Sequence, residues 1–199
     1  SGLLVAGPGA AADRPARILM GEPATIDPAA AGDAGSAAVI AQLFEGLTAV
    51  DPSRTARPAL AAGWELRDDG RTIVFRLRDG LTFSDGTPLT AEDVRRSWLR
   101  VIDPAAPSPL ASLLFDVEGA RAYAAGHGSA DAVGITAGDG TLEVRLTRPA
   151  GDFPAIAASP TLAVVPPGVG RDPSALAPGA GFVASGGYVL DGAVADGLR

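Results

Sequence analysis

The sequence has 199 residues, a formal net charge of −7, 26 Gly, 17 Pro and no Cys. A chain without Cys forms no disulfides and no thiolate metal sites, and arginines dispersed among acids argue against nucleic acid and anionic membrane surfaces as partners. No run of 18 apolar residues is present, so we expect no direct membrane insertion.

The first half of the chain predicts a leader, a strand, a loop, a helix and a hairpin. Residues 1–16 are a leader or linker, and Leu3 to Gly7 fit either the end of a signal peptide or a flexible apolar segment. The remaining expectations are a buried strand over 17–20, a loop over 21–36, a helix from a Ser36 cap to Leu47, and a hairpin of 64–66 with 72–78 around Asp69-Gly70.

The stretch FSDGTPLTAEDVRRSW, residues 83–98, predicts a strand–turn–helix joint. Asp85-Gly86 is a turn dipeptide, Thr90 is the expected N-cap, and Asp93 is placed to complete a capping box. Further along we expect a helix over 91–102, a helical patch over 110–125, a hairpin of 133–135 with 141–147, a short helix and then a strand within 155–165, a loop over 166–181, and a strand over 188–190. Interleaved helices and antiparallel hairpins predict a mixed α/β (α+β) fold.

No catalytic constellation is visible in the sequence. The only histidine, His127, lies between glycines, which is typical of a solvated loop residue, and neither a G-x-S-x-G elbow nor a phosphate-binding loop ending in Lys is present. The acids occupy turns and first turns of helices rather than a cluster that would hold a metal. We therefore expect no enzymatic activity, no metal and no cofactor.

Several segments, in this order, resemble one family. They are GEPATIDPA, QLFEGLTAVD, PALAAGWEL, DGRTIVFRLRDGLTFSDGTPLTAEDVRRSW, RVIDPAAPSPLAS, GDGTLEVRLTRPA and SGGYVL. Together they are similar to the family 5 extracellular solute-binding proteins, the peptide-, oligopeptide- and nickel-binding receptors of ABC importers. The resemblance runs from about residue 17 to residue 192.

The resemblance implies a type II periplasmic-binding-protein-like clamshell, of which this sequence carries one partial lobe and the extra domain of the peptide-binding class. It divides the chain into a first segment of the main lobe (17–45), the extra domain (46–150) and an incomplete return segment of the main lobe (151–199). On this basis we expect an N-terminal fragment of a receptor. The implied partners are a peptide or other small solute and the membrane permease of an ABC importer, and the implied location is periplasmic or extracellular, associated with the cell surface.

The resemblance also implies where a ligand binds. In peptide-binding members the loop after the Asp-Pro of the first segment lines the cleft, and extended backbone there pairs with a peptide as an added strand. The corresponding residues here are Gly32, Asp33, Ala34 and Gly35, and Leu110 stands where members often carry an aromatic residue. The alternative interpretations are that Asp33 is a turn acid before a helix and that Leu110 is an ordinary core residue.

The alternative to an importer receptor is a ligand-sensing module of a membrane-anchored or regulatory signalling protein.

Overall fold

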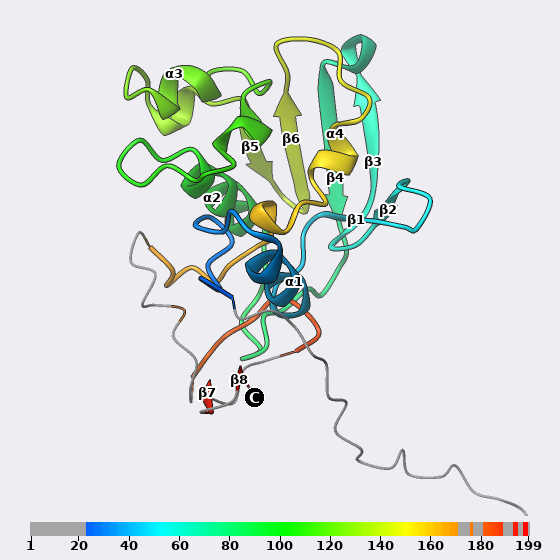
Figure 1. The fold of residues 1–199 in the computed structure, drawn as a ribbon. Coiled ribbons are helices and arrows are strands. Elements are labelled where there is room, and N and C mark those ends of the chain that lie inside the picture. Colours follow the sequence, from blue (N-terminus) through cyan, green and yellow to red (C-terminus); the bar gives the residue numbers. More distant parts are fainter. Residues whose placement is uncertain (1–22, 171–175, 177–180, 189–192, 195–196, 199) are drawn as a thin grey trace, which may run out of the picture.

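A four-stranded antiparallel sheet forms the centre of the protein. The structure, a computed structural model, describes residues 23–170, 176, 181–188, 193–194 and 197–198. The strands β3 (Ala61–Arg67), β4 (Thr72–Leu77), β5 (Ile135–Gly138) and β6 (Thr141–Arg145) lie in the order β3-β4-β6-β5, above α1 in Figure 1. Both predicted hairpins are confirmed, and the pairing of β4 with β6 joins them into one sheet.

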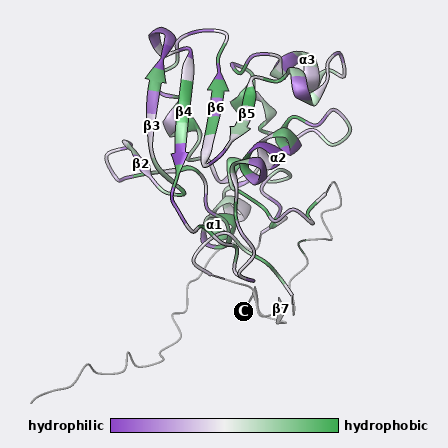
Figure 2. Cartoon of the chain, turned by 180° about the vertical axis from the view of Figure 1, so that it is seen from behind, coloured by the Kyte–Doolittle hydropathy of each residue, from purple (hydrophilic) through white to green (hydrophobic). Residues whose placement is uncertain are grey.

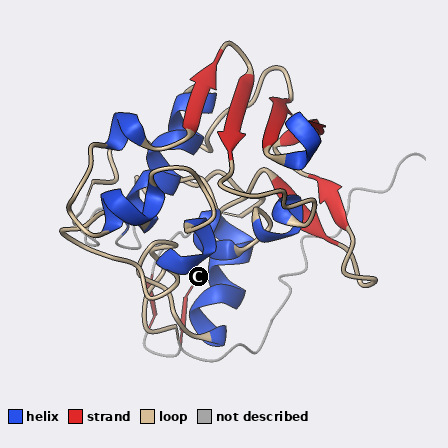
Figure 3. Ribbon diagram, turned by 90° about the horizontal axis from the view of Figure 1, so that it is seen from above, coloured by secondary structure: helices blue, strands red, loops and turns tan. Residues whose placement is uncertain are grey.

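The helices and two small ribbons complete the described fold. The helices are α1 (Ala34–Leu43), α2 (Ala91–Val101), α3 (Ala120–Ala124) and α4 (Phe153–Ile156), with 3₁₀ turns at Asp68–Gly70, Ala111–Leu114, Ala130–Ala132 and Pro160–Leu162. Strand β1 (Thr48–Val50) pairs with β2 (Ala56–Pro58), and β7 (Ala193–Val194) pairs with β8 (Gly197–Leu198). Seen from above in Figure 3, most helical segments lie to one side of the strands.

One face of the sheet is the main source of the core. Phe75 and Leu142 are paired across β4 and β6, as are Ile73 and Val144, and all four are fully buried. The opposite face is mixed: Thr72 and Val74 are buried there as well, whereas Glu65 pairs with the guanidinium groups of Arg67 and Arg76. Hydrophobic residues run along the strands and α1 in Figure 2. The period-two pattern in the sequence therefore predicted the correct inward face.

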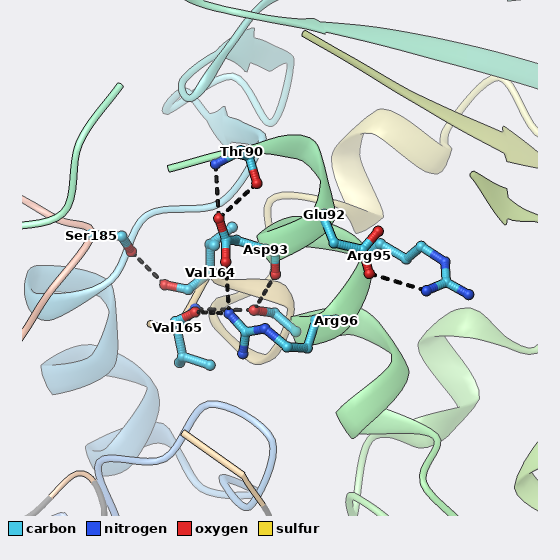
Figure 4. Close-up of polar contacts among 9 residues, drawn as sticks. Thr90, Glu92, Asp93, Arg95, Arg96, Val164, Val165 and Ser185 are labelled. Carbon is cyan, nitrogen blue, oxygen red and sulfur yellow. Dashed lines mark hydrogen bonds and ion pairs between the residues drawn. The ribbon is translucent and has the colours of Figure 1, made fainter. Parts of the chain in front are cut away.

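Helix α2 begins at the predicted cap. The backbone N–H and the hydroxyl of Thr90 both donate to the Asp93 carboxylate, at 2.9 and 2.8 Å. The same helix is tied to the segment at 164–165, because Arg96 donates to the Val165 carbonyl at 2.8 Å (Figure 4). The Ser185 hydroxyl in turn donates to the carbonyl of Val164. The hydrogen bond from Arg96 to Val165 thus fixes α2 against a part of the chain that lies about 70 residues later.

Buried hydrophobic residues form two clusters. The larger one is centred on the sheet and α2, where Trp98 lies edge-on to Phe75 and Phe153. The smaller one packs α1 against the later segments, through residues that include Val39, Ile40, Leu43, Phe44, Ala163, Val165, Val169, Leu176 and Ala184. In the larger cluster, Val94 and Trp98 of α2 meet the strand face formed by Ile73, Phe75 and Leu77.

The expected helix from Ser36 to Leu47 was wrong at both ends. Asp33 is the N-cap, and its carboxylate accepts from the Ser36 N–H, so the helix begins at Ala34. It ends at Leu43, because Phe44 is extended at φ −129° and ψ 143°. The apolar side chains of Val39, Ile40 and Leu43 are nevertheless buried, and Leu47 is fully buried although it lies outside the helix.

The helical patch expected over 110–125 is broken into a 3₁₀ turn and the short helix α3. Gly119 separates them with φ 71°, and a Cβ there would lie 2.4 Å from the carbonyl oxygen of Ala132. This close approach to another loop requires a glycine in a left-handed conformation, which no regular helix accommodates. The apolar pattern indicated one continuous helix, but Gly119 is the N-cap at which α3 begins, so this helix covers only Ala120–Ala124.

The strand expected within 155–165 is also wrong. Residues 163–165 are buried and in no sheet, because their N–H groups bond elsewhere: Val164 to the Glu45 carbonyl and Val165 to the Ser97 hydroxyl. The strand expected over 188–190 is not seen at Tyr188, which is exposed, and its other residues lie outside the described part. The strand expected over 17–20 lies outside it as well.

Candidate functional site

The loop that precedes α1 is a tight turn built around Asp27. Its carbonyl accepts from the N–H groups of Ala30 and Ala31, both at 3.1 Å, and its carboxylate accepts from Ala29 N–H at 3.0 Å. The Asp27 N–H itself donates to the Thr25 hydroxyl. An Asp before Pro favours such a turn, because the short carboxylate reaches the backbone two residues on. The turn fixes the direction in which the chain enters Gly32.

Asp33 caps the helix that follows. Its carboxylate accepts from the Ser36 hydroxyl at 2.6 Å and from the Ser36 N–H at 2.8 Å. These hydrogen bonds, that from the hydroxyl first, lower the pKa of the Asp33 carboxyl. Ala34 and Gly35 lie in the first turn of α1, so the expected extended backbone over 32–35 is wrong for these two residues. Helical residues do not pair with a peptide as a strand, because their geometry directs the backbone groups along the helix axis.

The structure brings the two parts of the predicted site together at Gly32 and Pro109. A Cβ added at Gly32 would lie 3.1 Å from the Pro109 Cβ, which places the loop of residues 27–33 against the segment that leads into Leu110. Leu110 is 37% exposed, so the alternative interpretation of Leu110 as an ordinary core residue is wrong. Gly32, Asp33 and Ala34 are exposed as well. An exposed, mainly uncharged surface therefore joins residues that lie far apart in the sequence.

A hollow of about 180 Å³ lies beside this contact. It is lined by Asp27, Ala29, Ala30, Arg100, Asp103, Ala106 and Pro107. Sequence reasoning missed Arg100, which pairs with Asp27 across 73 residues of sequence at 2.7 and 3.2 Å. Its position in the last turn of α2 favours a cation for the helix dipole. No local pattern, however, indicates the partner that the cation takes.

Two negative observations concern the described residues only. They contain no group of three or more His, Asp or Glu side chains placed to hold a metal ion. Within the same part of the chain, no helix combines the length and the apolar character that crossing a lipid bilayer requires.

Comparison with known proteins gives one family and a consistent set of relatives. The profile of the bacterial extracellular solute-binding proteins, family 5, middle region, matches residues 55–197. A probable deoxycholate-binding periplasmic protein of Escherichia coli, YgiS, is 40% identical over 148 residues, which are 73% of this chain and 28% of that protein. The oligopeptide-binding protein OppA of Bacillus subtilis is 39% identical over 129 residues, 64% of this chain and 24% of that one.

Solved structures agree with these relatives. The unliganded open form of the periplasmic murein tripeptide-binding protein MppA matches with a TM-score of 0.82 and 34% identity, covering 88% of this chain and 35% of that chain. Haemophilus influenzae OppA in complex with the peptide RPPGFSPFR matches with a TM-score of 0.80 and 30% identity, covering 87% of this chain and 34% of that one. The expected type II periplasmic-binding-protein-like fold, present in part, is confirmed. The chain spans about a quarter to a third of the length of these relatives.

Proposed function

We propose, because the chain belongs to the family 5 bacterial extracellular solute-binding proteins, that it forms part of a receptor that binds a peptide for an ABC-type importer. The receptor acts in the periplasm or at the extracellular surface and delivers its solute to a membrane permease. Proteins of this family are described as solute-binding rather than catalytic, and we infer that this one is not an enzyme. No observation favours the alternative of a ligand-sensing module in a signalling protein.

The observation that carries the proposal is the contact between Gly32 and Pro109. It joins the exposed end of the loop of residues 27–33 to Leu110 and forms one wall on which a ligand can lie. The exposed carboxylate of Asp33 keeps its charge, but its oxygens already accept from Ser36 at the start of α1, so this wall offers main-chain groups and apolar side chains beside one anion. Such a wall accepts peptides with different side chains, since affinity resides in groups that every peptide presents.

The apolar character of this wall narrows the choice of solute. Leu110 provides a 37% exposed hydrophobic side chain. The neighbouring hollow adds Ala29, Ala30, Ala106 and Pro107 beside three charged residues, Asp27, Arg100 and Asp103, of which Asp27 and Arg100 pair with each other. A site of this kind gains affinity by removing apolar ligand surface from water. We therefore expect peptides with hydrophobic side chains to bind more tightly than strongly charged ones. A bile acid such as deoxycholate, named for one relative, is the appropriate competing solute in the test.

The test is calorimetric titration of the 199-residue chain with a mixed library of tri- to pentapeptides and, separately, with deoxycholate. We expect weak, saturable peptide binding, because one wall supplies only part of the contacts of an enclosed ligand. Leu110→Asp should weaken it about tenfold, since a carboxylate replaces apolar contact. Val50→Asp is the matched control, because Val50 is an exposed hydrophobic residue on β1. Binding of deoxycholate alone, or of neither solute, would overturn the peptide assignment.

A further inference from the structure

The side chain of Arg100 connects three segments of the chain. Its Nη1 and Nη2 atoms donate to the two carboxylate oxygens of Asp27, at 3.2 and 2.7 Å. Its Nε donates to the Gly170 carbonyl at 2.8 Å. The side chains of Arg100 and Asp27 are only 12% and 5% exposed. A two-pronged pair of this kind fixes orientation as well as distance, because both nitrogens must face both oxygens.

The carboxylate held by Arg100 also builds the turn that leads to Gly32. The oxygen of Asp27 that accepts from Nη1 accepts from the Ala29 N–H as well. The Asp27 carbonyl accepts hydrogen bonds from the next two N–H groups of the turn, those of Ala30 and Ala31. The next residue after these, Gly32, lies against Pro109. A displacement of the Asp27 side chain would therefore move the backbone of the candidate ligand loop.

The helix that carries Arg100 is a rigid support. Trp98 and Val101, on either side of it in α2, are fully buried in the larger core cluster. The arginine thus links the fixed position of α2 to a loop whose buried hydrophobic side chains are small, namely Pro28, Ala29 and Ala31. Lysine would keep the positive charge but not the fork, because an ammonium group is a point charge.

We propose that Arg100 is a positioning residue for the candidate ligand loop, residues 27–33, which it holds in the shape that presents Gly32 beside Pro109. This inference rests on the proposed function for its biological meaning, but the structural effect can be measured without any ligand. Removing the guanidinium leaves a buried carboxylate without its cation, a loss that buried pairs do not tolerate. The loop should then open locally while the core of the sheet stays closed.

The test is amide hydrogen exchange of the 199-residue chain with Arg100→Lys and Arg100→Gln. We expect exchange at Ala29, Ala30 and Ala31 to accelerate about tenfold in Arg100→Lys, with β4 unchanged. Arg148→Gln is the control, because it removes an arginine from an exposed pair with Asp116 and should leave the loop unaffected. Arg100→Lys is the decisive variant if Arg100→Gln fails to fold.

Titration with the peptide library provides the second measurement. Arg100→Lys should weaken peptide binding about tenfold, and Arg148→Gln should not change it. Unchanged exchange over 27–33, or acceleration that is equal in β4, would overturn the positioning role. If the unmodified chain binds no peptide, the proposed function fails, while the exchange experiment still decides the role of Arg100.

Discussion

Replacement of Trp98 by Ala tests the packing of the larger core directly. Trp98 is fully buried and packs edge-on against Phe75 and Phe153, with ring centroids 6.4 and 5.9 Å away. Its indole N–H donates to the Leu162 carbonyl at 2.9 Å. The side chain thus joins the sheet, α2 and the segment around 153–162. Its removal leaves a cavity and an unpaired buried carbonyl at the same time.

We expect Trp98→Ala to lower the free energy of unfolding by about 3–5 kcal/mol, the range found for large aromatic residues truncated in a core. Since small domains are stable by only about 5–15 kcal/mol, the variant should unfold at much lower urea concentration or fail to fold. The measurement is urea denaturation followed by far-ultraviolet circular dichroism. Trp98→Phe provides a graded variant, because it keeps a ring and loses the hydrogen bond to Leu162, at a cost of about 1–3 kcal/mol.

Trp64→Ala is the matched control, because Trp64 lies on β3 and its ring, like that of Trp98, contacts Phe75. Trp64 is only partly buried against this cluster. Trp64→Ala should therefore lower the free energy of unfolding clearly less than Trp98→Ala does. If Trp98→Ala lowers the free energy of unfolding by less than about 1 kcal/mol, or if the two substitutions lower it equally, the packing described for α2 is refuted.

Three further predictions concern a cap, two glycines and an acid. Asp93→Ala removes the acceptor of both Thr90 donors and should cost about 1–2 kcal/mol in urea unfolding; a neutral result would contradict the cap. Gly119→Ala should cost more than Gly86→Ala in the same assay, because both have positive φ but only Gly119 lies against a carbonyl. Hydrogen bonds, that from a serine hydroxyl first, lower the pKa of Asp51 to about 2. Its stabilising effect is therefore present above its ordinary pKa and disappears as the pH falls to about 2, so the stability difference from Asp51→Asn should vanish there.

Local patterns predicted the parts of the fold that local chemistry determines. The alternation of Ile73, Phe75 and Leu77 identified a strand, and a turn dipeptide located its partner. The spacing of Thr90 and Asp93 located the start of α2. These features depend on residues within a few positions of one another, so a single sequence contains the whole signal.

Contacts between distant segments determined what the sequence did not reveal. Gly119 interrupts the helical patch expected over 110–125 because another loop crosses it, and residues 163–165 form no strand because their backbone groups bond to other segments. The candidate site shows the same limit. Gly32 and Leu110 were predicted from a family resemblance, whereas the pair of Arg100 with Asp27 joins residues 73 positions apart and follows from no local pattern.

Gly32 offers the sharpest test of whether the loop of residues 27–33 and the segment before Leu110 form one surface. A methyl group at Gly32 would lie 3.1 and 3.3 Å from the Cβ and Cγ of Pro109, closer than ordinary contact. Gly32→Ala should therefore push the two segments apart and cost about 1 kcal/mol, the lower end for overpacking. Gly151→Ala is the control, because a Cβ there meets open space and its φ is not positive.

The double variant Gly32→Ala with Pro109→Gly separates this contact from any other effect of the methyl group. If the crowding involves Pro109, removal of its ring should relieve most of the cost of Gly32→Ala, and the two changes should be non-additive by at least about 0.5 kcal/mol. Peptide titration should show the same coupling, since displacement of Gly32 from Pro109 also separates the loop from Leu110. Additive stability changes, with peptide binding unaffected by Gly32→Ala, would show that the two segments do not form a shared ligand surface.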